Sequence, residues 1–220
     1  MFTAVFDLDG TLADTSGDLL DAANAQFEAE GLGSPLTIAD RNTALLGGRA
    51  MLNAGAAKLG IDEEGFAERH YLSLLVHYEA NLANKTVFYP KVLEVLEALR
   101  SNGWKTSICT NKPIHLAEKL IEELNASHLF DSFIGVNSIP ERKPNPKPLF
   151  LAIERAGGTP EKSILVGDTA TDYNAAMNAG CGILLVDFED TKIGQEFPDA
   201  PIIGEFAQVE TYLTNWRNKF

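Results

Sequence analysis

The stretch FDLDGTLADT, Phe6–Thr15, closes the first apolar run of the chain with two acidic residues, Asp7 and Asp9. One leucine separates them, so an extended backbone directs both carboxylates toward the same region. Two negative charges this close repel each other, and they cost stability unless a cation, a proton or a reaction compensates. Gly10 and Thr11 then provide a tight exit from the strand. The two carboxylates therefore mark a candidate reaction site.

The overall composition is that of a globular protein large enough to bury a core. The chain has 220 residues, of which 45% are hydrophobic and 22% are charged. Its formal net charge of -13 argues against nonspecific binding to nucleic acid or to an anionic membrane, since both need a basic surface. An anionic substrate stays possible, because a few local cations can reverse the sign of a pocket. We expect a small-molecule substrate and no nucleic-acid or membrane partner.

The cysteines and the N-terminal run indicate the compartment. Cys109 and Cys181 form neither a disulfide framework nor a zinc-ligand spacing, which is typical of a reducing environment. No basic region precedes the first apolar run, which stops at Asp7, so we expect no signal peptide. No apolar stretch approaches the ~20 residues that span a bilayer. We expect a cytoplasmic protein that is a monomer or a homodimer.

Five short runs have the composition of buried β-strands. Most are continuously apolar rather than alternating, which is typical of parallel strands buried on both faces. Amphipathic helical patterns separate the last four runs, and strand followed by helix, repeated, predicts a Rossmann-like doubly wound α/β sheet. The expected strands are 3–9, 105–110, 132–136, 163–167 and 182–187.

A long helical insertion interrupts this rhythm after the first strand. About eighty residues lie between Asp9 and Tyr89, too many for a loop between two strands of one sheet. We therefore expect a core domain formed by 1–15 and 85–220, with an inserted all-helical cap domain at 16–84. The clearest helical patterns are 18–31, 48–60 and 66–82, punctuated by Gly31, Gly33, Pro35, Gly60 and Gly65.

Polar side chains follow three of the expected strands, and in open α/β sheets ligands bind beyond the carboxyl ends of the strands. An oxygen-rich site made by Asp7, Asp9 and Asp168 suits a hard cation, and Mg²⁺ fits best. A proline-stiffened loop, ERKPNPKP, adds two lysines. The residues concerned are Asp7 and Asp9, Thr110 and Asn111, Asp168 and Asp172, and Lys143 and Lys147.

Each of these features also has an ordinary structural explanation. An aspartate at a strand end can cap a helix, Thr110-Asn111 can start a turn, and prolines around a lysine can mean only a stiff exposed loop. VGDTATD can likewise be a strand followed by an N-cap aspartate. The coincidence of these features at successive strand ends favours a reaction site over four independent structural causes.

Four segments together resemble the motifs of the haloacid dehalogenase superfamily of phosphohydrolases. They are FDLDGTLADT, CTNK, KPNPKP and VGDTATD, in this order and spacing, and the resemblance covers essentially the whole chain, including the helical cap. The first and last motifs are highly specific, whereas the middle two are weak individually. Within the superfamily, DTSGDLLDAAN, Asp14–Asn24, is similar to the start of the cap in phosphoglycolate phosphatases.

The resemblance implies hydrolysis of a phosphate monoester through a phosphoaspartate intermediate. Asp7 would be the nucleophile, and Asp9 would protonate the leaving group and then deprotonate the attacking water. Mg²⁺ would be bound by the Asp7 carboxylate, the Asp9 backbone carbonyl and Asp168.

The same resemblance assigns the phosphate ligands. The Thr110 hydroxyl and the Asn111 backbone N–H would bind phosphoryl oxygens, with Lys143 adding positive charge. Lys143 is preferred to Lys147 because the family motif places lysine-proline first, although Lys147-Pro148 also fits. Asp172 would orient Lys143 or a metal-bound water.

The cap would select the substrate. Gly47-Gly48-Arg49 reads either as a tight turn that directs Arg49 toward a substrate carboxylate or second phosphate, or as a helix start with a solvated arginine. His70, His77 and Tyr78 read as packing or surface residues. The substrate favoured by the resemblance is 2-phosphoglycolate, with sugar phosphates and nucleoside monophosphates open.

Other activities of the same fold, and one of a different class, stay as alternatives. A haloalkanoate dehalogenase has no leaving alkoxide and no use for Asp9. Family sugar phosphomutases carry a histidine directly after the position of Asp18, where this chain has Leu19. A phosphonate hydrolase needs a cap lysine, for which Lys58 is a loose candidate. A phosphate-binding regulatory module without turnover would not need every catalytic position filled.

Overall fold

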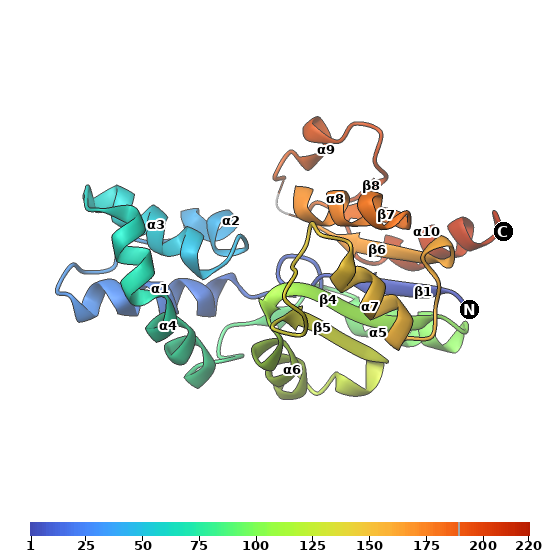
Figure 1. Cartoon of the computed structure of the whole chain (residues 1–220), viewed down its shortest axis with the longest axis horizontal. Coiled ribbons are helices and arrows are strands. Elements are labelled where there is room, and N and C mark those ends of the chain that lie inside the picture. Colours follow the sequence, from blue (N-terminus) through green and yellow to red (C-terminus); the bar gives the residue numbers. More distant parts are fainter. Residues whose placement is uncertain (189) are drawn as a thin grey trace. The chain divides into compact units, whose positions relative to one another are not determined.

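The computed structural model describes residues 1–188 and 190–220, which divide into two compact units (Figure 1). Met1–Ala13 and Phe88–Phe220 form the larger one, called the core unit below. Asp14–Val87 form the smaller one, called the helical unit. Among the described residues no helix is both long enough and apolar enough to cross a membrane.

A six-stranded sheet forms the centre of the core unit. Every strand pair in it is parallel, and the order β5-β4-β1-β6-β7-β8 places β1 between β4 and β6. The expected doubly wound α/β fold is therefore confirmed. The strands are β1 (Thr3–Phe6), β4 (Lys105–Pro113), β5 (Ser132–Val136), β6 (Ser163–Gly167), β7 (Gly182–Val186) and β8 (Ile202–Ile203).

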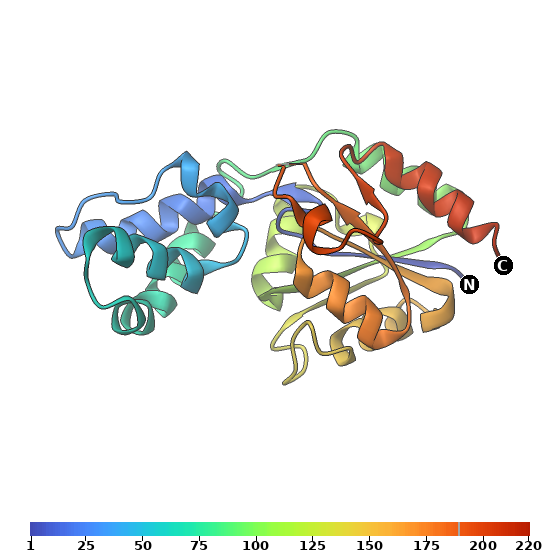
Figure 2. The ribbon, with the colours of Figure 1, turned by 90° about the horizontal axis from the view of Figure 1, so that it is seen from above.

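Helices cover both faces of this sheet. Figure 2 shows α5 and α10 on one face and α7 and α8 on the other. Side chains from the strands, such as Val5, Leu165 and Leu185, are fully buried against this second layer. The helices are α5 (Val92–Ser101), α6 (Ile114–Glu123), α7 (Lys147–Arg155), α8 (Ala170–Ala179), α9 (Ile193–Glu196) and α10 (Gln208–Arg217), with short 3-10 turns at Ser127–Leu129 and Pro160–Lys162.

Three strands of this sheet differ clearly from the sequence-based expectation. β1 ends at Phe6, three residues before the expected end at Asp9. β4 continues through Asn111 and Lys112 to Pro113, three residues past the expected end at Thr110, and its register with β5 shifts between Cys109 and Pro113. The Asn-Lys-Pro composition hides this extension because it resembles a turn. β8 adds an unexpected edge strand that is too short to leave an apolar pattern.

The helical unit contains α1 (Ser16–Ala29), α2 (Arg41–Ala44), α3 (Gly48–Leu59) and α4 (Glu63–Ala80), with a 3-10 turn at Ile38–Asp40. The rings of Phe27 and Phe66 stack at 4.3 Å in its core. Gly55 makes room for this pair, because a Cβ there would lie 2.5 Å from the Phe27 ring. Gly65 lies inside the first turn of α4 rather than ending a segment, so its expected role as a break was wrong.

The chain crosses between the units twice, at β2 (Ala13–Asp14) and β3 (Val87–Phe88), and these two strands pair as a two-stranded sheet. Within the helical unit, the buried Asp18 carboxylate accepts hydrogen bonds from the backbone N–H groups of Lys85 and Thr86. The first turn of α1 is thereby fastened to the segment that leaves the unit.

Candidate active site

Asp7 is fixed by the end of the central strand. Its backbone N–H donates to the carbonyl of Val166 at 2.9 Å, which extends the parallel pairing of β1 with β6 by one residue. Its carboxylate accepts a hydrogen bond from the N–H of Leu8 at 2.8 Å. Asp7 is thus held on a rigid element at the carboxyl edge of the sheet, where the sequence predicted it.

Asp168 directly follows β6 and lies beside the turn that leaves β1. Its carboxylate accepts a hydrogen bond from the Thr11 hydroxyl at 2.7 Å. Gly10 has a φ of +83°, and a Cβ at that position would lie 2.3 Å from Asp168 Oδ2. Gly10 and Thr11 therefore shape the site as well as the turn, a role that the sequence analysis did not assign to them.

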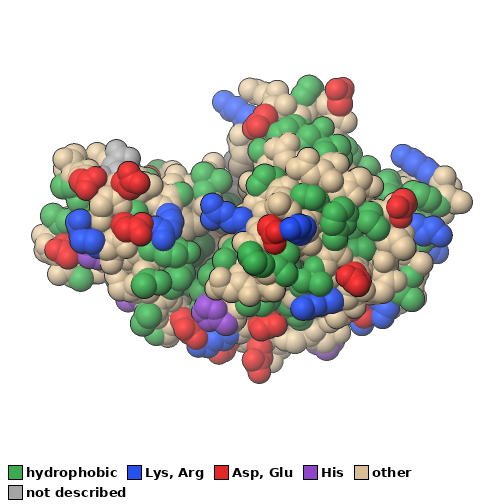
Figure 3. Space-filling model, in the orientation of Figure 1, with side chains coloured by type: hydrophobic (Ala, Val, Ile, Leu, Met, Phe, Trp, Pro, Cys, Tyr) green, Lys and Arg blue, Asp and Glu red, His purple; other side chains and the backbone are tan. Residues whose placement is uncertain are grey.

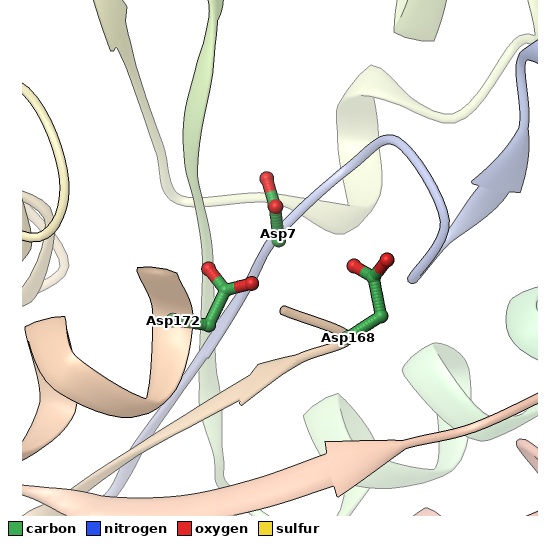
Figure 4. A group of neighbouring side chains, drawn as sticks. All are labelled: Asp7, Asp168 and Asp172. Carbon is green, nitrogen blue, oxygen red and sulfur yellow. The ribbon is translucent and has the colours of Figure 1, made fainter. Parts of the chain in front are cut away.

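Three carboxylates converge at this edge of the sheet. Figure 4 shows Asp7 beyond β1, Asp168 beyond β6 and Asp172 on α8, and each offers an oxygen within 4.8 Å of the other two. Oxygen donors grouped in this way are those that hard divalent cations prefer. The predicted metal ligands Asp7 and Asp168 lie close together, and the carboxylate of Asp172 lies beside both.

Burial and mutual repulsion oppose ionisation of Asp7 and Asp168, and Lys143 offsets only part of this. Burial raises the pKa of Asp7 to about 6, and the negative charges of Asp172 and Asp9 act in the same direction, against Lys143. Burial, followed by the charges of Asp172 and Asp7, also raises the pKa of Asp168. A bound divalent cation favours the charged form of each carboxylate, so these residues fit a metal site.

Lys143 is buried against the acidic cluster, with its side chain 1% exposed. Its ammonium lies 2.6 Å from Asp172 Oδ1 and 3.1 Å from Asp7 Oδ1. Burial alone would lower the pKa of Lys143, but the charges of Asp172 and Asp7 outweigh burial and raise it. The lysine therefore keeps its positive charge next to the predicted nucleophile.

Asp172 is itself held in place by the start of α8. Its carboxylate accepts hydrogen bonds from the Thr169 N–H at 3.1 Å and the Thr169 hydroxyl at 2.6 Å, as part of a capping box. A carboxylate fixed in this way is suited to orient Lys143.

Lys147, the competing lysine, lies elsewhere. It is the first residue of α7, its side chain is 62% exposed, and it pairs with Glu141. The structure thus places Lys143, and not Lys147, beside Asp7.

Thr110 and Asn111 lie on the extended end of β4. The Thr110 hydroxyl accepts a hydrogen bond from the Lys112 N–H at 3.2 Å. The side-chain amide of Asn111 donates to the carbonyl of Lys143 at 3.0 Å, which ties the lysine loop to the sheet. The predicted use of the Asn111 backbone N–H for phosphate stays a prediction.

Lys112 had no role assigned from the sequence, although it stands in the CTNK motif. Its side chain is only 4% exposed, and its ammonium lies 2.8 Å from Asp9 Oδ1. Thr110 and Lys112 are buried while Asn111 between them is exposed, a pattern that depends on the extension of β4 past its expected end.

The predicted cap residues lie in the helical unit. Gly48 begins α3, and the Arg49 guanidinium lies 4.2 Å from the Tyr71 ring centre and 3.1 Å from Glu68. The Arg49 side chain is 51% exposed and borders a surface pocket of about 380 Å³. A role for Gly48 and Arg49 in substrate binding stays a prediction.

One face of the molecule shows how its surface charges are distributed. On the face shown in Figure 3, Lys and Arg side chains are scattered among acidic and apolar ones. That visible face does not show the continuous basic surface that nucleic acid requires.

Comparisons with known proteins identify the family of the chain. Residues 2–180 match the model of the haloacid dehalogenase-like hydrolase family. The chain is 35% identical to a phosphoglycolate phosphatase of Mesorhizobium japonicum, over 95% of this chain and 93% of that protein. It is 33% identical to a phosphoglycolate phosphatase of Aquifex aeolicus, over 90% of this chain and 91% of that protein.

A solved structure from Haemophilus somnus, described as a predicted phosphoglycolate phosphatase, superimposes with a TM-score of 0.80 at 27% identity. The match covers 96% of this chain and 97% of that one. The expected resemblance to phosphatases of this superfamily is confirmed, and the chain belongs to the haloacid dehalogenase-like hydrolase family.

Proposed function

We propose that this phosphatase hydrolyses a small phosphate monoester, with 2-phosphoglycolate as its substrate, through a phosphoaspartate on Asp7. The observation that carries the proposal is the buried contact between Asp7 and Lys143, with Asp172 and Asp168 grouped around it. Phosphoryl transfer depends on positioning and on charge stabilisation, and this arrangement supplies a fixed nucleophile beside a fixed cation.

In the first step the Asp7 carboxylate attacks phosphorus opposite the leaving oxygen. Lys143, the Thr110 hydroxyl and the Asn111 N–H bind the phosphoryl oxygens. Fixing these donors before the reaction lowers the barrier, because they need no reorganisation as charge develops.

Asp9 acts twice in this scheme. It gives a proton to the departing alkoxide, and it then takes a proton from the water that hydrolyses the phosphoaspartate. We place Asp9, two residues after the nucleophile, on the leaving-group side of the phosphorus in this scheme.

We propose that the metal is Mg²⁺, which Asp7, Asp168 and the Asp9 backbone carbonyl would hold. When bound, Mg²⁺ neutralises the repulsion between the anionic nucleophile and the anionic phosphate. Asp172, 2.6 Å from Lys143, orients the lysine. The choice of 2-phosphoglycolate follows the phosphoglycolate phosphatase relatives. We further propose that the helical unit, Asp14–Val87, is the cap that selects the substrate.

The test is a phosphate-release assay on a panel of esters, with and without Mg²⁺, ranked by kcat/KM. The panel contains 2-phosphoglycolate, p-nitrophenyl phosphate, a sugar phosphate and a nucleoside monophosphate. We expect Mg²⁺-dependent release, loss of release in Asp7→Asn, and 2-phosphoglycolate as the best substrate. A kcat/KM for 2-phosphoglycolate no higher than for p-nitrophenyl phosphate contradicts the substrate assignment. Release by Asp7→Asn at the wild-type rate contradicts the mechanism.

A further inference from the structure

The buried lysine Lys112 has no part in the mechanism above. It is the last residue but one of β4, and its ammonium contacts the carboxylate of Asp9 at 2.8 Å. A lysine that is 4% exposed is rare, because removing an ammonium from water costs free energy that its contacts must offset. Its position beside the proton-transferring residue suggests a use in the reaction.

Three backbone features hold Lys112 in place. Thr110 and Lys112 are buried while Asn111 between them is exposed, so the first two share one face of the strand. The Lys112 N–H is bonded to the Thr110 hydroxyl at 3.2 Å. The backbone of Lys112 packs closely against Gly135 of β5, where a Cβ would lie 2.6 Å from the Lys112 carbonyl oxygen. Lys112 is thus held on the side of β4 where Thr110 is proposed to bind phosphate.

We propose that Lys112 determines specificity by binding a carboxylate on the leaving group of the substrate. This inference rests on the proposed function, in which Asp9 faces the leaving oxygen. An ammonium in contact with Asp9 then lies beside the atoms attached to that oxygen. In an ester such as 2-phosphoglycolate the carboxylate is two bonds from the ester oxygen, within reach of the same ammonium.

The two buried lysines contact different carboxylates, so we assign a different anionic group of the substrate to each. Lys143 lies between Asp7 and Asp172, where it serves the phosphoryl group. Lys112 lies on the Asp9 side, where the leaving group departs. A substrate with a phosphate and a carboxylate complements both positions, whereas an ester of a neutral alcohol leaves the Lys112 contact unmade.

The test compares two esters that differ in this one group. 2-Phosphoglycolate and 2-hydroxyethyl phosphate have similar lengths, but only the first carries a carboxylate on its leaving group. The ratio of their kcat/KM values is measured for the wild type, Lys112→Met, Lys112→Arg and the exposed control Lys147→Met. Because both substrates are assayed on one preparation, the ratio does not depend on the fraction of folded enzyme.

We expect the wild type to prefer 2-phosphoglycolate, and Lys112→Met to reduce that preference roughly 10- to 100-fold, the usual worth of a charged hydrogen bond. Lys112→Arg should retain part of the preference, and Lys147→Met should retain all of it.

A Lys112→Met enzyme that keeps the wild-type ratio overturns the inference, while the proposed substrate stands. A uniform loss on both esters also overturns it, because Lys112 then acts only through Asp9 or the fold. A wild type that hydrolyses neither ester overturns the proposed function and the inference together.

Discussion

Two buried carboxylates, Asp18 in the helical unit and Asp7 in the core unit, are satisfied in different ways. Asp18 accepts hydrogen bonds from the N–H groups of Lys85 and Thr86 at 2.9 and 2.8 Å, and from the Thr86 hydroxyl at 2.7 Å. These donors are neutral. Asp7 instead lies among other carboxylates and is compensated by Lys143.

The difference indicates a structural role for Asp18 and a catalytic role for Asp7. Neutral donors fixed by the backbone stabilise an anion without placing like charges together, and the result at Asp18 is a fastening between α1 and residues 85–86. Carboxylates that lie close together repel one another and lower the stability of the fold, so such a cluster indicates a metal site or a reaction site. Replacing members of each group should therefore affect different properties.

The largest expected effect comes from Asp7→Asn. We expect kcat to fall roughly 10⁴-fold or more, as for other nucleophile replacements. The thermal midpoint of the metal-free protein should rise, because a buried negative charge with a raised pKa is removed. Steady-state kinetics and calorimetry check the two effects, and a lower midpoint together with retained activity would contradict both.

Replacing the buried lysine should have the next largest effect. Lys143→Met is expected to lower kcat roughly 10²- to 10³-fold, the range found when a donor that stabilises charge in the transition state is removed. Lys147→Met is the matched control and should stay within about twofold, since its pair with Glu141 is exposed. Equal losses in the two variants would contradict the assignment of Lys143.

Asp18→Ala should act on stability. It leaves three donors of Lys85 and Thr86 without their partner, and we expect the free energy of unfolding to fall by about 2–4 kcal/mol. Urea unfolding followed by circular dichroism measures the loss. A variant as stable as the wild type would show that the fastening contributes nothing.

The smallest expected effect is the pH dependence of the stabilisation by Mg²⁺. The pKa of Asp7 is raised from 3.8 to about 6, so between these values the metal-free folded protein binds more protons than the unfolded chain. Its stability should therefore fall as the pH rises through this window. Mg²⁺ removes that cost, so we expect its addition to raise the melting temperature more near pH 7.5 than near pH 5, by about 3 °C. An equal gain at both pH values would contradict a site built on Asp7.

Much of the site followed from the sequence because parallel strands bring their carboxyl ends to one edge. Asp7 and Asp168 each end a continuous apolar run, and β1 and β6 are neighbours. The position of Lys112 was harder to predict, because its Asn-Lys-Pro context has the composition of a turn. Gly10 was predicted as an exit turn, but its close approach to Asp168 depends on a pairing of distant segments that no local pattern records.

The central claim, a covalent intermediate on Asp7, has a direct test. Enzyme and 2-phosphoglycolate are mixed with Mg²⁺, quenched in acid within the first turnover, digested and examined by peptide mass spectrometry. We expect a phosphoryl group on the peptide that contains Asp7, and its absence in Asp7→Asn. Phosphate attached to another residue, in an enzyme that turns over normally, would contradict it.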